Sequence, residues 1–478
     1  MHSWSRFSVG RRLRSLVPMA AMVLMVSASV PDAQAELPRT EDGAGVKVGQ
    51  RSTFHPGIAL VVGADTNVFW TDRRDNGGVS PAAVMTPVGW LGIGNREVRD
   101  GVLQSTPERS DRKVDYNLRV TSAYRAYLSR KENVIRQSRF NLVLDAHVNV
   151  APGRKFSFSF DEKFSRLAEP RNYEAAPDYN FNRIDHRGAL TFTFRPGGGR
   201  LSLAASYLSE ALYYEAADIV NADRLVNGAG AEIKYRIFPR SSLALNYTFR
   251  NTYYLCCGST GTGRNEDSDH HRVMVGYRGQ IGERLLLMAM AGFGSGKYYY
   301  DDTGPNFSGP LAQLGVTYFP TLRTQLFAVF NRNFQDSLFG NYYIDTGGQI
   351  GASHLFRWKM LAFLRFEVYG RRYAGIPIPG QDISGPGQTG PGGTFIAGYD
   401  NADGFVRKDT VIGLNAKVEQ PFGRFFVLAL RYNLVSAVTP FAVRYGIVPG
   451  GDTDPNTPDR DYGRFVKNIV MLIGAVRF

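Results

Sequence analysis

The 478-residue chain lacks the long apolar runs of helical membrane proteins, the spaced cysteines of disulfide scaffolds and several common enzyme motifs. Beyond residue 35, no apolar run approaches the roughly 18 residues of a transmembrane helix. Its two cysteines, Cys256 and Cys257, are adjacent, so they provide no framework of spaced disulfides. A strained vicinal disulfide and two free thiols both fit this pair. The mature chain also lacks the G-x-S-x-G, H-E-x-x-H and P-loop motifs.

The first 35 residues are typical of an export leader. Arg11, Arg12 and Arg14 form a basic segment, residues 16–30 are apolar, and an A-x-A motif ends at Ala35. The apolar run is shorter than the roughly 20 residues that span a bilayer. We therefore predict a signal peptide over 1–35 rather than an uncleaved anchor. Because the leader holds four basic residues and one acid, the mature chain keeps about +10 of the total charge of +13.

Beyond the leader, the dominant hydrophobic period is two. Residues 156–160 alternate phenylalanine with serine, and the segments 190–194, 243–249 and 426–434 alternate in the same way. Alternation over about ten residues is the pattern of a transmembrane β-strand, which needs roughly 9–11 residues to cross the hydrocarbon at a tilt. The mean hydropathy of −0.23 fits a barrel, because every second strand residue faces a polar lumen.

The connections between these runs alternate in length. Tight turns lie at 152–154, 197–200, 238–241, 282–284, 320–323, 357–359 and 422–424. Longer polar loops lie near 129–138, 168–182, 214–223, 256–269, 298–308, 336–343, 375–408 and 436–463. Such alternation predicts a closed antiparallel up-and-down barrel with short periplasmic turns and longer outer loops. The charged segment 95–112 departs from this rule, since it is long and falls on the short-turn side.

The sequence predicts an all-β chain in which the barrel has about 18 strands, a count fixed to within two. The predicted strands lie near 54–71, 82–94, 113–128, 139–151, 155–167, 183–195, 200–213, 224–238, 241–255, 270–281, 284–297, 309–319, 323–335, 344–356, 359–374, 409–420, 424–435 and 464–478. The predicted organisation is therefore a signal peptide (1–35), a periplasmic N-terminal segment (36–53) and a barrel (54–478).

The last strand also indicates the bacterial outer membrane. Its apolar residues share one parity, and the chain ends at Phe478. A terminal aromatic residue on an alternating strand resembles the signal that the barrel-assembly machinery reads. We therefore predict that machinery and outer-membrane lipid as partners.

The same parity assigns side chains to the lumen. Leu118 and Val120 are predicted to face lipid, which turns Arg119 inward, because lipid-facing Lys or Arg costs about 2–4 kcal/mol at the bilayer midplane. The residues predicted to line the lumen are Arg119, Arg125, Asp145, His147, Asp161, Lys163, Asp185, Arg187, Glu232, Lys234, Arg236, Arg365, Glu367, Lys417, Glu419, Arg431 and Lys467. They form either a wet path for a polar solute or a set of ion pairs that brace the interior. Glu162 departs from the parity, so we expect a bulge or a rim position there.

The outer regions allow further predictions. Tyrosines near the outer strand ends, in the pairs 213–214, 253–254 and 342–343 and in the run 298–300, fit an interfacial girdle or a set of sugar-stacking rings. The loops 375–408 and 436–463 either fold inward as a constriction or stay outside. The acids of 452–461 lack the order of an EF-hand. The surplus of positive charge favours anionic solutes or the negatively charged outer leaflet.

Two histidines lie near acids in the sequence. His147 is two residues from Asp145, and His186 is beside Asp185. A lone histidine in a lumen is more often a hydrogen-bonded lining residue than a catalytic base. We predict that the chain is not an enzyme and that it uses no cofactor, no metal ion and no nucleic acid.

The first two strands resemble a known family. Pro56-Gly57-Ile58 leads to Asp65-Thr66-Asn67-Val68-Phe69, and Ser80-Pro81 and Thr86-Pro87 follow. With the Arg-bearing tight turns and Phe478, these segments resemble the β-barrel porin 2 family of exopolysaccharide export systems, whose plan is similar to the barrel of the poly-N-acetylglucosamine exporter. Here the N-terminal helical-repeat domain of that exporter is missing. The resemblance therefore implies a separate periplasmic partner, a polysaccharide co-polymerase or export protein, which segment 95–112 would contact.

The leading functional hypothesis is a passive conduit through which a secreted polysaccharide, an exopolysaccharide or capsule-like polymer, crosses the outer membrane. The first alternative is a general or solute-specific diffusion porin. The second is a structural or adhesive barrel. The sequence does not identify the polymer or solute, and it leaves the oligomeric state open.

Overall fold

A computed structural model describes residues 37, 43–49, 51–71, 79–95, 113–168, 182–215, 223–255, 267–299, 306–337, 341–374, 408–439, 442–444, 460–462 and 464–478. Several predictions lie outside these residues: the signal peptide, almost all of segment 95–112, the pair Cys256 and Cys257, the loop 375–407, and the acids at 452–459. Within the described residues, no helix has both the length and the apolar character needed to cross a membrane.

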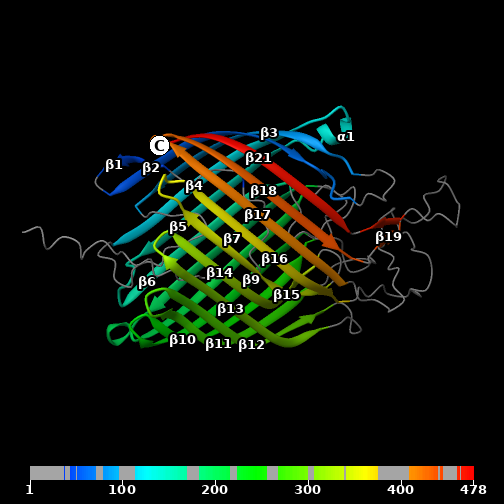
Figure 1. The fold of residues 1–478 in the computed structure, drawn as a ribbon. Coiled ribbons are helices and arrows are strands. Elements are labelled where there is room, and N and C mark those ends of the chain that lie inside the picture. Colours follow the sequence, from blue (N-terminus) through cyan, green and yellow to red (C-terminus); the bar gives the residue numbers. More distant parts are fainter. Residues whose placement is uncertain are drawn as a thin grey trace, which may run out of the picture.

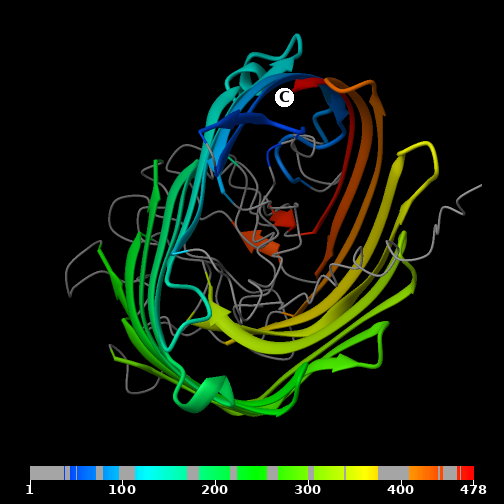
Figure 2. The same ribbon diagram turned by 90° about the vertical axis from the view of Figure 1, so that its left-hand side faces the viewer.

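The described residues form a closed antiparallel β-barrel of 18 strands (Figures 1 and 2). Its strands are β2 (Ser52–Asp65), β3 (Ala82–Gly94), β4 (Val114–Leu128), β5 (Arg139–Val150), β6 (Phe156–Leu167), β7 (Arg183–Phe194), β8 (Leu201–Tyr214), β9 (Arg224–Phe238), β10 (Ser241–Tyr254), β11 (Ser268–Ile281), β12 (Leu285–Tyr298), β13 (Phe307–Thr321), β14 (Thr324–Asp336), β15 (Tyr342–Leu355), β16 (Leu361–Tyr373), β17 (Lys408–Phe422), β18 (Phe426–Val438) and β21 (Phe465–Arg477). Each strand pairs with its neighbour in the chain, and β2 pairs with β21 to close the ring. The predicted fold class is confirmed.

The strand bounds agree closely with the prediction except in the first strand. The predicted run 54–71 is too long, because β2 ends at Asp65 and the chain then turns. The side chain of Asn67 holds this turn: its Oδ1 accepts from the Thr71 amide at 3.0 Å, and its Nδ2 donates to the Thr71 carbonyl at 2.7 Å. An asparagine that bonds to the backbone in this way competes with the strand ladder and ends it.

Five short elements of the described residues lie outside the ring of 18 strands, and one of them is the 3₁₀ turn η2 (Gly197–Gly199) between β7 and β8. β1 (Val46–Val48) pairs with the start of β2. The helix α1 (Glu132–Ile135) lies in the connection between β4 and β5. The hairpin of β19 (Ala442–Arg444) and β20 (Arg460–Tyr462) lies past the outer strand ends in Figure 1 and, seen along the axis, within the outline of the ring in Figure 2.

The outer surface of the barrel is apolar. On β2, Ile58, Leu60 and Val62 are exposed while Ala59 and Val61 between them are buried. Exposed large apolar side chains recur in this alternation on the other strands, so the predicted parity is confirmed. A closed barrel with such an exterior buries its apolar band in lipid and its backbone polar groups in the strand ladder. The protein therefore resides in the bacterial outer membrane.

The inner surface is not uniformly polar. One apolar cluster joins the closing strands and includes Val61, Trp90 and Ile473. Gly57 makes room for this cluster, because a Cβ at this position would lie 2.1 Å from the Trp90 ring. A second cluster, which includes Met288 and Met290, covers the inner faces of β10–β15. Charged side chains share the inner wall with these clusters: Arg119 lies on β4 with Ala123 of the first cluster, and Arg278 lies on β11 with Met274 of the second.

Candidate functional site: the inner wall of the barrel

A row of charged side chains crosses the inner faces of β4–β8. Its members, which we call the inner charge row, are successive register partners: Arg119, Asp145, Lys163, Arg187 and Glu210. Glu210 also accepts from Arg250 Nη2 on β10 at 2.8 Å. Arg250 and Glu210 keep about a fifth of their side-chain surface exposed, which leaves them accessible from the interior.

Three ion pairs join predicted lining residues that are two apart on one strand. Lys234 Nζ lies 3.0 Å from Glu232 Oε1, and Lys417 Nζ lies 2.8 Å from Glu419 Oε2. Arg365 Nε lies 3.9 Å from Glu367 Oε2, at the edge of an ion pair. The pairing supports the bracing interpretation for these residues and leaves the lumen-lining role a prediction.

Both acids of the first two pairs also contact a second strand. Glu232 contacts Arg278 of β11 at 3.1 Å, and Glu419 contacts Arg477 of the last strand at 2.9 Å. The sequence did not indicate these partners, because each lies more than 40 residues from its acid.

The two histidines differ in how they lie relative to the acids that neighbour them in sequence. His147 Nδ1 lies 2.6 Å from Asp161 Oδ1 on the adjacent strand, and it shares the inward face of β5 with Asp145. Asp185 is buried and accepts from Arg183 Nε at 2.7 Å, on the opposite face of β7 from His186. Asp185 therefore does not pair with His186, and His147 contacts an acid of the next strand that the sequence did not indicate.

Three more predicted lining residues lie on inward strand faces. On β4, Arg125 shares its face with buried Ala123; on β9, Arg236 shares its face with Glu232; and on β18, Arg431 shares its face with buried Ala429. Arg431 Nε donates to Asn433 Oδ1 at 3.4 Å. Within the described residues, no three His, Cys, Asp or Glu side chains gather as ligands for a metal ion.

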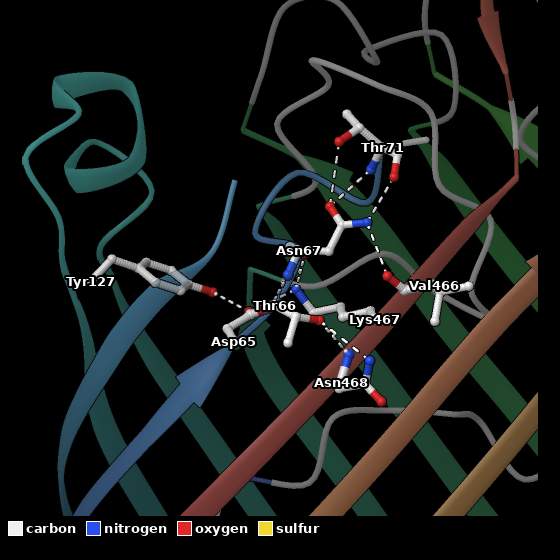
Figure 3. A network of polar contacts seen from close by, with 8 residues as sticks. All are labelled: Asp65, Thr66, Asn67, Thr71, Tyr127, Val466, Lys467 and Asn468. Atoms are coloured by element: carbon white, nitrogen blue, oxygen red, sulfur yellow. Dashed lines mark hydrogen bonds and ion pairs between the residues drawn. The ribbon is translucent and has the colours of Figure 1, made fainter. Parts of the chain in front are cut away.

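Lys467 has a different position from the other predicted lining residues. Its side chain is 2% exposed and lies in the wall where the last strand meets the first (Figure 3). Its Nζ lies 2.7 Å from Asp65 Oδ2 and 2.6 Å from the Asn67 carbonyl oxygen, and 4.5 Å from the centre of the Trp70 ring. Tyr127 OH donates to the same carboxylate at 3.3 Å. Lys467 therefore links the last strand, β21, to the end of the first strand, β2.

The first-strand motif supplies this junction. The backbone of Asn67 donates to Asp65 Oδ1 at 2.9 Å, and its side-chain amide donates to the Val466 carbonyl at 3.2 Å (Figure 3). Thr66 Oγ1 accepts from the Asn468 amide at 2.9 Å. The D-x-N segment that carries the family resemblance thus makes contacts that close the barrel.

Glu162 lies neither at a bulge nor at a rim. The register of β6 with both neighbours is continuous through it, and Glu162 shares the outer face with exposed Phe156 and Phe158. There Glu162 Oε1 lies 2.7 Å from His186 Nδ1. The expectation of a bulge or rim position was wrong, because a cross-strand partner compensates the charge in place.

Two of the tyrosine pairs divide between the two faces, whereas Tyr342 and Tyr343 are both buried. Tyr213 and Tyr253 are exposed on the outside, whereas Tyr214 and Tyr254 are buried on the inside. Adjacent strand residues point to opposite faces, so a pair cannot place both rings in the girdle. The girdle interpretation therefore holds for one ring of each of these pairs.

The sequence did not predict a buried cluster of charged side chains at the outer end of the inner wall. Asp336, at the end of β14, lies 3.4 Å from His270 Nε2 and 4.0 Å from Arg224 Nη1. Arg272 Nη2 donates to the Phe334 carbonyl at 2.7 Å, and its guanidinium lies 4.5 Å from the Phe334 ring centre. These residues come from strands far apart in sequence, so no local pattern indicates the cluster.

No protein-family model and no curated protein matches the chain. Among solved structures, it is similar to the outer membrane protein OpdK from Pseudomonas aeruginosa, with 10% identity and a TM-score of 0.42, over 89% of this chain and 99% of that chain. It is also similar to a BenF-like porin from Pseudomonas fluorescens Pf-5, with 9% identity and a TM-score of 0.43, over 90% and 99% of the two chains. The chain is an 18-stranded outer-membrane β-barrel. Its resemblance to the β-barrel porin 2 family stays a prediction.

Proposed function

We propose that this protein is a diffusion porin through which small polar solutes, anions in preference, cross the outer membrane passively. The observation that carries the proposal is the inner charge row. It holds three bases and two acids in the order Arg119, Asp145, Lys163, Arg187 and Glu210. Charges along an inner wall replace part of the hydration of a passing ion and select its sign. No step of such transport needs catalysis.

Basic residues outnumber acids on the inward parity of β4–β11. The bases are Arg119, Arg125, Arg139, Lys163, Arg183, Arg187, Arg224, Lys234, Arg236, Arg250, Arg272 and Arg278, and the acids are Asp115, Asp145, Asp161, Asp185, Glu210 and Glu232. A wall with one sign in excess raises the local concentration of the opposite ion. The balance therefore supports a preference for anions.

The polysaccharide conduit is the second candidate, and it depends on the family resemblance of the first two strands. The D-x-N part of that motif is explained by its contacts across the closing strands, so it carries no further argument for a polymer. A diffusion porin needs only the barrel and its charged wall, and we favour it for that reason. A structural or adhesive barrel would not need an accessible charged wall.

Planar-bilayer recording tests the proposal. The wild-type protein is expected to conduct with an anion preference in a KCl gradient, and Lys163→Glu with Arg187→Glu is expected to lower or reverse that preference. Lys297→Glu is the matched control, because Lys297 is exposed at the outer end of β12 on the opposite parity from the inward residues. Absence of conductance, or a reversal potential unchanged by the inner substitutions, would overturn the porin. Loss of surface polysaccharide on gene deletion would favour the conduit instead.

A further inference from the structure

The outer face of β6–β10 carries a continuous row of polar and small side chains inside the apolar band. Its members, which we call the polar lane, are consecutive register partners: Glu162, Gly188, Ser209, Asn227 and Asn251. They share parity with exposed apolar residues, such as Phe158 on β6 and Leu190 on β7. The lane therefore lies on the membrane-facing side.

The lane climbs across the membrane. Glu162 lies in the middle of β6, whereas Asn251 lies near the outer end of β10. Polar groups near the rim contact headgroups and water, but a carboxylate in the middle of the strand faces hydrocarbon. The deep end of the lane is the part that lipid solvates poorly.

At the deep end of the polar lane, one ring nitrogen of His186 has no hydrogen-bond partner within the described residues. His186 Nδ1 is bonded to Glu162, but within the described residues His186 Nε2 makes no hydrogen bond, and the His186 side chain is 36% exposed. A polar group that faces hydrocarbon without a partner is costly, and such groups usually face protein. The residues beside it are small: Gly188 pairs with Glu162, and Ala211 pairs with His186. Small residues allow another backbone to approach closely.

From this arrangement we infer that the polar lane is the contact surface between two copies of this chain. The chemistry is self-complementary, because the acceptor Glu162 and the free ring nitrogen of His186 lie side by side. Copies of one protein have the same orientation in the membrane, so a two-fold axis along the membrane normal brings groups of equal depth together. His186 Nε2 of one copy then forms a hydrogen bond with the Glu162 carboxyl group of the other, and the reciprocal bond forms by symmetry.

Opposite charges support a second copy over lipid as the occupant. Further out on the same face, Arg166 forms two bonds with Glu215, at 2.5 and 2.8 Å, so this guanidinium is already paired and is a poor ligand for lipid phosphates. The face as a whole offers acids and bases together, which another copy of the same face matches.

Cross-linking in intact outer membranes tests the contact. In a Cys256→Ser, Cys257→Ser background, Ser209→Cys is expected to give a dimer with a short bifunctional thiol reagent. Ile350→Cys is the control, because Ile350 is 60% exposed on the outer face of β15, away from the lane. A monomer from Ser209→Cys, an equal dimer from Ile350→Cys, a larger ladder or a cross-link to another protein would each overturn the inference.

A second measurement separates the contact from folding and from transport. Purified wild type is expected to be a dimer by light scattering, and Glu162→Leu with His186→Phe is expected to raise the dimer dissociation constant by about tenfold or more. The variant should keep its heat-modifiable gel mobility and its ion selectivity. Arg332→Leu is the matched control, since Arg332 bonds Thr346 at 2.9 Å on another part of the exterior. A monomeric wild type, or a double variant as dimeric as wild type, would refute the contact.

Discussion

Lys467 and Asp65 are 402 residues apart in the chain, yet Nζ and Oδ2 lie 2.7 Å apart in the wall of the barrel. Both side chains are almost completely buried. This pair joins the last strand to the first. The Asn67 backbone amide donates to the other carboxylate oxygen, Oδ1, and Tyr127 OH also donates to Oδ2. The closure of the barrel is thus fixed at its outer end by a buried ion pair as well as by the strand ladder.

Removal of one member of that pair is expected to destabilise the barrel. Lys467→Met leaves the Asp65 carboxylate buried without its cation, and such a change typically costs about 3–5 kcal/mol. Urea unfolding in detergent, followed by the gel-mobility difference between boiled and unboiled samples, measures the loss. Combining Lys467→Met with Asp65→Asn should restore part of the stability; if the double variant is less stable than Lys467→Met alone, the pair is not the cause.

Replacement of Gly57 is expected to disturb the inner apolar cluster. The new methyl of Gly57→Ala would lie 2.1 Å from the Trp90 ring, so the ring must move. Overpacking of this kind costs about 1–3 kcal/mol. Thermal unfolding should show the loss, and Trp90→Leu in the same chain should recover some of it. Gly474→Ala is the control, because no atom lies within 4 Å of a Cβ there.

Neutralisation of Glu210 is expected to raise the anion preference of the channel. Glu210→Gln removes a negative charge from the inner row, and one charge at 10 Å in water is worth about 0.4 kcal/mol, or roughly a twofold change in permeability ratio. Reversal potentials in bilayers measure it. The difference from wild type should shrink in 1 M KCl, because salt at that concentration screens charges beyond about 3 Å. A shift toward cations would contradict the sign of the wall.

Asp223, which precedes β9, predicts a pH dependence. It accepts from the Tyr214 amide at 2.7 Å, and burial raises the pKa of its carboxyl above the ordinary value. The folded state therefore binds this proton more tightly than the unfolded chain, and stability from this group falls as pH rises through the folded pKa. Asp223→Asn keeps an acceptor without the charge, so the variant should be at least as stable at pH 7 and less sensitive to pH in acid unfolding. A variant with an unchanged pH profile would exclude Asp223 as the source.

Deletion of Phe478 is expected to reduce assembly more than stability. The Phe478 amide donates to the Pro56 carbonyl at 3.1 Å, and its ring centre lies 5.0 Å from that of Phe425, while its side chain stays partly exposed. A recognition signal for the assembly machinery would therefore remain accessible. Pulse-chase labelling should show slower conversion to the folded form in cells, with normal unfolding of the purified protein. Normal assembly would refute the signal.

The sequence alone determined the barrel, because a strand in lipid must alternate apolar and polar side chains over its whole length. That period predicted the strand at 224–238 to the residue and most others to within two residues, and it predicted an inward position for Arg119 and Lys163. It also showed that Glu162 does not share the strand parity of the other charged residues. The length of the first strand was overestimated, because Asn67 bonds to the local backbone and ends the strand. The hydrophobic period does not reveal such a bond.

Only the tertiary structure decided which charges meet. The pairing of Lys467 with Asp65, of His147 with Asp161 and of Glu162 with His186 depends on strand register and on the closure of the ring. A period of two assigns each side chain to a face but carries no information about height on the neighbouring strand. The physical reason is that register is set by the turns and by the hydrogen bonds of the strand ladder, which the hydrophobic period does not encode. The contact of Lys467 with Asp65 forms only when the last strand meets the first.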